Sequence, residues 1–589
     1  MTRTPIGILV RHHRFLAVLV AKLSEQVDNP SRPRETLAVI LMFFARIPVR
    51  REPTRAARVT IDMNPPDAET TLSLLDEMVE RYPERPAVID ERRSVTYREL
   101  QHSADELASG LRSLGVDSGD RVAILMENRI EWVETMFASL RLGASIVGVS
   151  TWATAPELEY FLSHSGASTL VAVDSFAGND FVSTLSDVLG DLSVQDGGLE
   201  SPVIPSLDTV VFLGAAEPWA HRFEDVAQTE PVQTDSDPND PADEALLLYT
   251  SGSTSRPKGV PLLHGGHVEN GYQIGERMHL SPADRIWLTS PLFWSYGVAN
   301  AFGAAFSHGG SLVLQAPFEP ETAIDLIDEH ECTVYYGMPN MARDIVEADG
   351  FDPSRIHFRT GTTIGSPEDV EYTMDRLGID ELCNVYGSTE TYGNCAVTDC
   401  KLPREVRVHT QGRALDGQDI VIADPDTGER LEQGQVGEIR VGGRITPGYH
   451  DAPEKNAEAF DEEGYLKMGD LGRLDSEGRV QFRGRLKNMI KTGGINVSPV
   501  EVEERLLEHP AVDQAYVVGV ADAEKDELIA AAIVPETDES VTVDDIREHC
   551  SSLAAYKRPD RVKFVDSRAL PTTDTGKIKR NELGVTLFE

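Results

Sequence analysis

Apolar and polar residues follow a repeating helix–strand pattern along most of the chain. Residues 71–82 carry apolar side chains at helical spacing, and the apolar run 87–90 that follows has the length of a strand. The same reasoning predicts further helices over 97–114, 132–142 and 157–164, and further strands over 122–126, 145–149 and 169–173. Strands that alternate with helices of this length predict a parallel sheet covered by helices on both faces.

Beyond residue 410 the pattern changes twice. Residues 410–485 form short apolar segments separated by glycines, which predicts a small β-subdomain. The last hundred residues combine predicted helices and strands in a compact α+β unit, with helices over 500–507 and 543–550 and strands over 515–520, 528–534 and 562–564. We therefore predict an α/β fold. A large N-terminal domain of doubly wound sheets (63–486, β-subdomain included) is followed by a smaller, mobile α+β C-terminal domain (487–589).

The chain is strongly acidic, and its basic residues are unusual. Its 589 residues include 97 acidic and 55 basic side chains, a formal net charge of −42, and only 12 of the basic residues are lysines. The electrostatic field of such a negative charge repels nucleic acid, anionic membranes and anionic substrates at low salt. At about 1 M salt the Debye length is only about 3 Å, so the repulsion is screened. We therefore expect a protein adapted to a salt-rich cytoplasm; an acidic protein of an ordinary cell is the alternative.

The first 62 residues differ from the rest, because they carry 11 basic and 5 acidic residues. The apolar runs 15–20 and 37–44 are too short to span a membrane, and no convincing signal peptide is present. Two interpretations stay open: a basic amphipathic extension that touches a membrane surface, or an upstream stretch that is absent from the mature protein. We expect the second interpretation, because the acidic part of the chain begins at Met63.

The five cysteines form neither a CxxC pair nor a Cys/His ligand cluster along the sequence. We therefore expect a reducing cytoplasm and no structural metal. Cys383 is expected to be a packing residue and not a nucleophile.

Residues 246–260, LLLYTSGSTSRPKGV, join an apolar strand to a loop rich in hydroxyls and glycine. Glycine lets backbone N–H groups approach a ligand, and hydroxyls and a lysine add directional donors and charge. The loop also leaves the carboxyl end of a predicted parallel strand, where open α/β sheets bind ligands. We interpret it as a polyphosphate cradle. It differs from the kinase-type P-loop because no Ser or Thr follows Lys258.

A second group of polar residues extends this site. The segment 384–390, NVYGSTE, offers an aromatic ring, hydroxyls and a carboxylate that suits Mg²⁺. Asp470 and Arg485 stand at predicted strand ends and suit ribose hydroxyls. Four of the few lysines fall in glycine-rich loops, where a compact ammonium suits phosphate: Lys258, Lys487, Lys491 and Lys577.

The motifs TSGSTSRPKG, NVYGSTE, MGDLG, GRLKNMIKTGGINVSPVEVE and PTTDTGKIKR, in this order, resemble the adenylate-forming superfamily of acyl-CoA synthetases, carrier-protein adenylation domains and luciferases. The resemblance runs from about residue 71 to 581. One departure is Ser255, which stands where glycine is usual.

The resemblance implies two half-reactions that use ATP, Mg²⁺ and coenzyme A. A carboxylate first attacks the α-phosphorus of ATP to give an acyl-adenylate and pyrophosphate, and a thiol then displaces AMP. The resemblance also implies the nucleotide-binding residues: Thr250, Ser251, Gly252, Ser253, Thr254 and Lys258 for the phosphates; Gly361, Thr362, Asn384, Tyr386 and Gly387 for adenine; Asp470 and Arg485 for ribose; and Thr389, Glu390 (on Mg²⁺) and Lys577 for catalysis.

The resemblance further implies a hinge, a thiol channel and an acyl pocket. Lys487 matches the hinge about which the C-terminal domain swings, and Lys491, Gly493 and Gly494 would line the pantetheine channel. The acyl pocket would include Trp294, Tyr336, Gly337, Met338 and Thr363. Trp294 as a core-filling residue is an equal alternative. No Asp or Lys is evident among these positions, which favours an apolar acid, fatty or cyclic/aromatic.

Three hypotheses follow for function. The first is a cytoplasmic carboxylate–CoA ligase that acts on a small-molecule acid, without nucleic acid or firm membrane association, as a monomer or homodimer. The second is an adenylating enzyme that serves a carrier protein; no carrier domain follows Glu589 in this sequence. The third is a catalytically silent nucleotide-binding homologue, against which the intact Lys577 and Glu390 argue.

Overall fold

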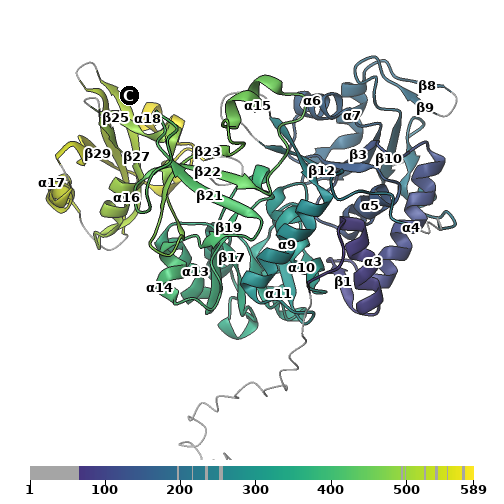
Figure 1. The fold of residues 1–589 in the computed structure, drawn as a ribbon, viewed down its shortest axis with the longest axis horizontal. Helices are drawn as coiled ribbons and strands as arrows, with labels where there is room; N and C mark the ends of the chain where they lie inside the picture. Colours follow the sequence, from purple (N-terminus) through teal and green to yellow (C-terminus); the bar gives the residue numbers. More distant parts are fainter. Residues whose placement is uncertain are drawn as a thin grey trace, which may run out of the picture. The chain divides into compact units, whose positions relative to one another are not determined.

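The computed structural model describes residues 65–195, 198–214, 217–231, 236–250, 257–492, 495–497, 499–522, 525–536, 541–553, 555–572 and 578–588. The contacts between residues divide the chain into two units, Met1–Asp62 and Met63–Glu589. Every described residue belongs to the second unit (Figure 1).

Two large sheets form the N-terminal part of this unit. The first has seven strands, in the order β11 (His221–Arg222), β10 (Thr209–Leu213), β5 (Thr169–Val173), β3 (Arg121–Leu125), β4 (Ser145–Gly148), β12 (Glu244–Thr250) and β13 (Lys258–Leu263). All neighbours are parallel except β12 and β13, which are antiparallel.

The second sheet has nine strands. Their order is β2 (Ser94–Thr96), β1 (Pro86–Ile89), β15 (Ser311–Leu314), β14 (Arg285–Leu288), β16 (Val334–Tyr336), β17 (Thr360–Thr363), β18 (Glu381–Tyr386), β19 (Ala396–Val397) and β20 (Arg413–Ala414). The six inner strands, β1, β15, β14, β16, β17 and β18, pair in parallel with one another. The strands β2, β19 and β20 pair antiparallel at the edges. The prediction of parallel pairing is therefore right for the inner strands of both sheets and for the β11 edge. The strands β2, β13, β19 and β20 add antiparallel pairs that the prediction did not include.

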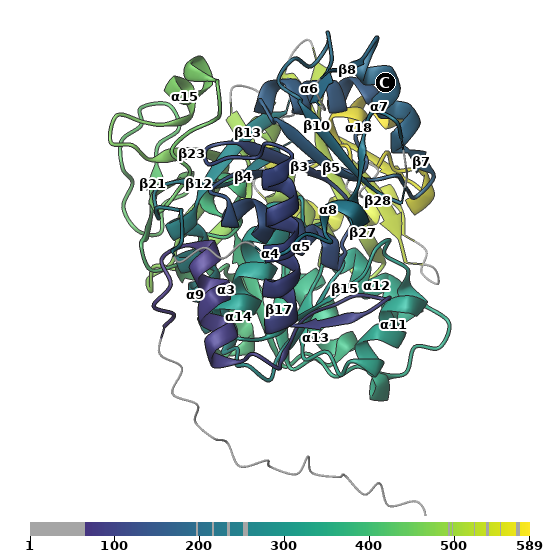
Figure 2. The ribbon, with the colours of Figure 1, turned by 90° about the vertical axis from the view of Figure 1, so that its right-hand side faces the viewer.

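The predicted helices are present, with ends within a few residues of those expected. They are α3 (Thr71–Arg81), α4 (Tyr97–Ser113), α5 (Ile130–Arg141) and α6 (Ala155–Ser165). Thr70 and Thr96 cap the first two through capping boxes, which explains their sharp starts. Figure 2 shows α4 and α5 side by side. Nearly every residue of α5 is buried, so this helix belongs to the main hydrophobic core.

The remaining helices of the large domain follow their strands in the chain. They are α7 (Phe181–Leu189), α8 (Phe223–Val226), α9 (His264–Met278), the π-helical turn η1 (Tyr296–Phe302), α10 (Gly303–Ser307), α11 (Pro320–Glu329), α12 (Pro339–Glu347), α13 (Pro367–Leu377) and α14 (Arg404–His409). A π-turn at η1 is notable because such turns recur at functional sites. Ring contacts between Phe137 on α5 and Phe302 in η1 tie this turn to the core.

The β-subdomain and the C-terminal part also match the prediction. The subdomain is a four-stranded antiparallel sheet of β21 (Gln418–Ala423), β22 (Gly437–Gly443), β23 (Leu466–Leu474) and β24 (Val480–Arg485), with α15 (Pro453–Ala459) inserted. The C-terminal part, yellow in Figure 1, contains β25 (Ile490–Thr492), β26 (Ile495–Val497), α16 (Pro499–Leu507), β27 (Val512–Asp522), β28 (Asp526–Pro535), α17 (Val543–His549), β29 (Arg561–Phe564) and α18 (Arg580–Phe588).

The α/β fold with a smaller α+β domain is thus confirmed. Among the described residues, no helix has both the length and the apolar character that a membrane span needs.

Candidate active site

The predicted phosphate loop joins two antiparallel strands of the seven-stranded sheet. Thr250, at the end of β12, pairs with Lys258, at the start of β13, so the base of the loop is closed. Two hydrogen bonds fix the strand after the loop. The Tyr160 hydroxyl donates to the Pro257 carbonyl at 2.9 Å. The backbone N–H of His450 donates to the Gly259 carbonyl at 2.9 Å. Ser251, Gly252, Ser253 and Thr254 lie outside the described residues.

Lys258 and Glu390 are connected through a tyrosine from a third segment. The Tyr449 hydroxyl donates to Glu390 Oε1 at 2.8 Å, and Lys258 Nζ lies 4.3 Å from the centroid of the Tyr449 ring. Burial and the neighbouring Glu390 carboxylate raise the pKa of Tyr449 well above its usual value, so its hydroxyl stays a donor at neutral pH. The three side chains form what we call the Lys–Tyr–Glu chain.

Thr389 lies in the same turn as Glu390, the short 3₁₀ segment η3 (Thr389–Thr391). Its Oγ1 is 3.0 Å from Ser295 Oγ, and Ser295 directly follows Trp294. The Thr446 N–H donates to the Glu390 carbonyl at 2.7 Å, which fixes the turn against the segment that carries Tyr449. The two predicted catalytic residues Thr389 and Glu390 are therefore held by backbone and side chain alike.

The residues predicted for the nucleoside meet across two sheets. The Tyr386 hydroxyl donates to Asp470 Oδ2 at 2.7 Å, and Arg485 Nε lies 2.9 Å from Asp470 Oδ1. Asp470 and Arg485 face each other as a cross-strand pair of β23 and β24. Burial and the Asp470 carboxylate raise the pKa of Tyr386. The ribose roles of Asp470 and Arg485 stay predictions.

The other predicted adenine residues are in adjacent parallel strands, and most are engaged by the protein. Gly361 is paired with Tyr335, and a Cβ atom on Gly361 would stand 2.1 Å from the Tyr335 carbonyl oxygen, so only glycine fits. The Thr362 hydroxyl is 2.7 Å from the Tyr296 hydroxyl. Asn384 is buried, and its amide donates to the Val408 carbonyl at 3.5 Å.

Gly387 follows β18 directly and is packed as closely as Gly361. A Cβ atom there would stand 2.4 Å from the Gly393 carbonyl oxygen. A side chain at this position would therefore push the NVYGSTE turn away from Gly393. The adenine roles of these residues stay predictions.

The predicted acyl-pocket residues divide into an aromatic rim and a buried floor. The Trp294 ring lies 5.0 Å from the Trp152 ring, centroid to centroid, in an edge-to-face contact, and 5.9 Å from the Phe293 ring. Tyr336 is fully buried, 4.7 Å from the Tyr296 ring. Gly337 and Thr363 are buried and Met338 is half-buried.

The Thr363 hydroxyl has no hydrogen-bond partner among the described residues, although the residue is fully buried. A buried hydroxyl is normally hydrogen-bonded, so this position suits a polar group brought by a ligand.

Sequence reasoning missed four side chains that the structure places at these sites: Tyr449, Ser295, Trp152 and Phe482. Phe482 lies 6.0 Å from the Tyr386 ring. Ser295 stands next to the predicted Trp294 in an aromatic-rich segment, and Phe482 stands three residues before the predicted Arg485, so their positions could have indicated them. Tyr449 and Trp152 stand apart from the predicted motifs.

Several predicted residues of the C-terminal part lie outside the described residues or carry side chains that the structure does not describe. Gly493, Gly494 and Lys577 are of the first kind. Lys487 falls in the short turn η4 (Leu486–Asn488) directly after β24, and Lys491 in β25, and only their backbones are described.

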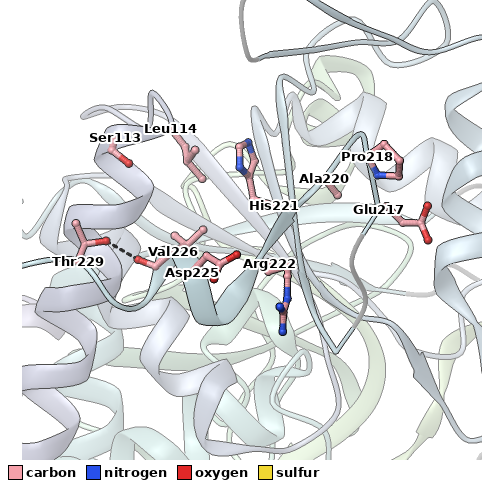
Figure 3. A pocket seen from close by; sticks show the side chains of 10 residues that line it. All are labelled: Ser113, Leu114, Glu217, Pro218, Ala220, His221, Arg222, Asp225, Val226 and Thr229. Carbon is pink, nitrogen blue, oxygen red and sulfur yellow. Dashed lines mark hydrogen bonds between the residues drawn. The ribbon is translucent and has the colours of Figure 1, made fainter.

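A cavity of about 580 Å³ opens at another place, beside the end of α4 and the segment from β11 to α8 (Figure 3). Its lining contains none of the predicted site residues. Its lining combines acidic and basic side chains, since Glu217 and Asp225 accompany His221 and Arg222. We assign it no role in the chemistry.

Comparison with known proteins gives consistent matches over nearly the whole acidic body. The family profile described as "AMP-binding enzyme" matches residues 75–450, and that described as "AMP-binding enzyme C-terminal domain" matches residues 501–577.

Two curated relatives and one solved structure illustrate the similarity. The chain is 32% identical to a putative acyl-CoA synthetase, YngI, of Bacillus subtilis, over 87% of this chain and 95% of the relative. It is 30% identical to the mitochondrial medium-chain acyl-CoA ligase ACSF2 of Mus musculus, over 86% of each. The ATP-bound structure of MatB from Rhodopseudomonas palustris superposes with a TM-score of 0.75 at 26% identity, over 87% of this chain and 98% of that one.

Proposed function

The chain belongs to the AMP-binding enzyme family as an AMP-forming acyl-CoA ligase, and we propose that the acid it activates is apolar, either fatty or cyclic/aromatic. The observation that supports the substrate class is the group of three aromatic rings, Trp152, Phe293 and Trp294, that contact one another. The predicted pocket residue Tyr336 is fully buried. Apolar rings favour an apolar acyl group because burying apolar surface is favourable.

The relatives and neighbours include ligases of fatty and of aromatic acids, and they also extend beyond this range: the o-succinylbenzoate coenzyme A synthetase of Bacillus subtilis has a similar structure, with a TM-score of 0.70 at 27% identity. Besides the medium-chain ligase above, a benzoate CoA ligase from Burkholderia xenovorans has a similar structure, with a TM-score of 0.73 at 25% identity. The substrate of this chain is a proposal that rests on its own pocket residues.

We propose the following roles in adenylation. Lys258 and the loop before it hold the β- and γ-phosphates, and Thr389 contacts the α-phosphate. The Lys–Tyr–Glu chain supports these roles, because it holds one cation and one carboxylate in fixed relation beside the loop. Little covalent chemistry falls to the protein in phosphoryl or adenylyl transfer, so positioning and charge stabilisation supply the rate.

The chemistry of Glu390 fits Mg²⁺. A carboxylate is a preferred ligand of this ion, and only Oε1 of Glu390 is engaged by Tyr449. When bound, the ion neutralises charge on the phosphate oxygens. Tyr449 orients the carboxylate from the outside, as outer-shell partners do in metal sites.

We further propose that residues 487–589 move as a lid about Lys487. In one position Lys577 stabilises the charge that shifts between the acid and the α-phosphate; in the other, Lys491 and the two glycines after it line the thiol channel. The location of Lys487 directly after the last strand of the β-subdomain supports a hinge there.

The test is an assay of AMP release with Mg²⁺, ATP and a panel of acids, with and without coenzyme A, at molar salt. A ligase gives AMP and acyl-CoA with apolar acids and depends on coenzyme A for turnover. Pyrophosphate exchange with an acid whose AMP release is not stimulated by coenzyme A would favour a carrier-protein acceptor. Preference for charged acids would contradict the proposed substrate class, and the absence of exchange with every acid would contradict catalysis.

A further inference from the structure

A histidine, an aspartate and a cysteine meet at the edge of the nine-stranded sheet, although about 120 residues separate the first from the other two. His279 ends helix α9, and Asp399 and Cys400 follow β19. One ligand atom of each residue lies within 4.8 Å of the other two. His279 Nε2 is 3.2 Å from Asp399 Oδ2 and 3.3 Å from Oδ1. We call these three residues the HDC cluster.

The backbone holds the HDC cluster in place. The Cys400 N–H donates to the Arg277 carbonyl in the last turn of α9 at 2.9 Å, which ties the two segments together two residues before His279. His279 adopts the left-handed conformation (φ 51°) of a helix C-cap, and its carbonyl accepts from Arg359 at 2.8 Å. The Lys401 N–H donates to Asp399 Oδ1 at 2.8 Å, which orients that carboxylate.

The burial of the three side chains is graded from the interior to the solvent. Cys400 is 2% exposed, Asp399 is half-buried and His279 is exposed. A sulfur at the bottom with an imidazole and a carboxylate above it leaves an entry path for a small cation from the solvent side.

We propose that the HDC cluster binds one divalent transition-metal ion of the zinc class. Thiolate, imidazole and carboxylate together are the ligands that such ions take, whereas Mg²⁺ and Ca²⁺ prefer oxygen alone. Zinc–ligand distances of about 2.0–2.3 Å in a tetrahedron place the ligand atoms about 3.3–3.8 Å apart. The imidazole nitrogen and the carboxylate oxygens are already near that separation, and the remaining pairs, all within 4.8 Å, need to close by no more than about 1.5 Å.

Binding would exchange one proton for the metal ion. On binding, the S–H bond of Cys400 breaks, the sulfur–metal bond forms, and the proton leaves to solvent. Glu381, whose Oε2 accepts from the Cys400 thiol at 3.9 Å, provides the route. Thiolate and carboxylate together neutralise the dication. Glu381 is itself paired with Lys401 and Arg359, so water and not Glu381 would complete the coordination of a bound ion.

The proposed site is distinct from the nucleotide site. Glu381 begins β18 and Tyr386 ends it, so about five residues of strand, roughly 17 Å, separate the two sites. A bound ion would link the end of α9 to the segment after β19. The proposal does not depend on the acid substrate or on catalysis.

The test uses the full chain, freed of metal by a chelator and titrated with Co²⁺ in molar KCl with excess Mg²⁺ and no ATP. We expect one equivalent to bind with thiolate-to-cobalt charge-transfer and tetrahedral d–d absorption. Cys400→Ala is expected to abolish the charge-transfer band, and His279→Asn to weaken binding by at least about tenfold. Asparagine tolerates the left-handed backbone, so the helix cap is retained.

Matched controls are His409→Asn, an exposed histidine elsewhere, and Cys550→Ala, a buried cysteine of the C-terminal part. Both are expected to bind Co²⁺ like the unaltered chain. Asp399→Asn, at a half-buried position, serves as a second ligand variant if Cys400→Ala does not fold. Charge-transfer absorption that survives in Cys400→Ala, equal loss in the controls, or no stoichiometric binding by the unaltered chain would each overturn the proposal.

Discussion

Replacing Tyr449 by Phe tests whether Glu390 acts as an oriented metal ligand. The substitution removes one hydroxyl that donates to Glu390 Oε1 at 2.8 Å and keeps the ring 4.3 Å from the Lys258 ammonium. Volume and packing are conserved, so we expect the fold and the position of Lys258 to persist. Only the orientation of the carboxylate changes.

The magnitude follows from the type of bond that is lost. A hydrogen bond to a charged group contributes about 1.5–3 kcal/mol, and loss of an outer-shell partner typically costs about 10–100-fold in metal affinity or activity. About 1.4 kcal/mol corresponds to a factor of ten, so the two ranges agree. We therefore expect Tyr449→Phe to need about 10–100 times more free Mg²⁺ for half-maximal adenylation.

The assay is pyrophosphate exchange at saturating acid as a function of free Mg²⁺, at constant high salt. Tyr465→Phe is the matched control, because its hydroxyl also donates to a carboxylate, Asp419 Oδ2 at 2.6 Å, at an exposed place in the β-subdomain. A Mg²⁺ dependence of Tyr449→Phe that equals the control's would refute the role of Glu390. A lower maximal rate with an unchanged Mg²⁺ requirement would refute it too, because a misoriented metal ligand has to weaken the metal.

Four further predictions follow. Lys577→Ala is expected to lower adenylation by at least about 10²–10³-fold with folding intact, and normal pyrophosphate exchange would count against its role. Burial lowers the pKa of His264 and of His267 to about 4, from 6.5, so the unfolded chain binds more protons between these values and stability falls as the pH drops from about 6.5 to 4. The free energy of unfolding falls by about 3 kcal/mol per histidine over this pH range. Urea unfolding should show a smaller difference in stability between pH 7 and pH 5 for His267→Asn than for the unaltered chain. The exposed control His102→Asn should show the same difference as the unaltered chain. Activity with ATP should rise with KCl into the molar range, and a steady decline in kcat/KM for ATP from 0.1 M upward would contradict the screening interpretation. Trp294→Ala should raise KM for apolar acids by about tenfold with little change in KM for ATP; equal changes in both would indicate a structural tryptophan.

The sequence by itself determined the class of the fold and the kind of chemistry. Helix and strand periodicity depends on residues close together in the chain, so elements such as α3 and the strands around it could be predicted to within a few residues. The glycine- and hydroxyl-rich motifs are also local, and their order was sufficient for the family. The antiparallel edge strands β13 and β20 were missed, because antiparallel partners are set by tertiary pairing.

Contacts between distant segments were decided only by the tertiary structure. Tyr449 joins Lys258 to Glu390 from another part of the chain, and a Gly-Tyr pair alone does not reveal that role. The same holds for His279 and Cys400, which sequence spacing excluded as a ligand pair and which a turn at the end of α9 brings together. Spacing patterns detect ligands only when they share one helix or loop, whereas packing unites side chains across any separation in sequence.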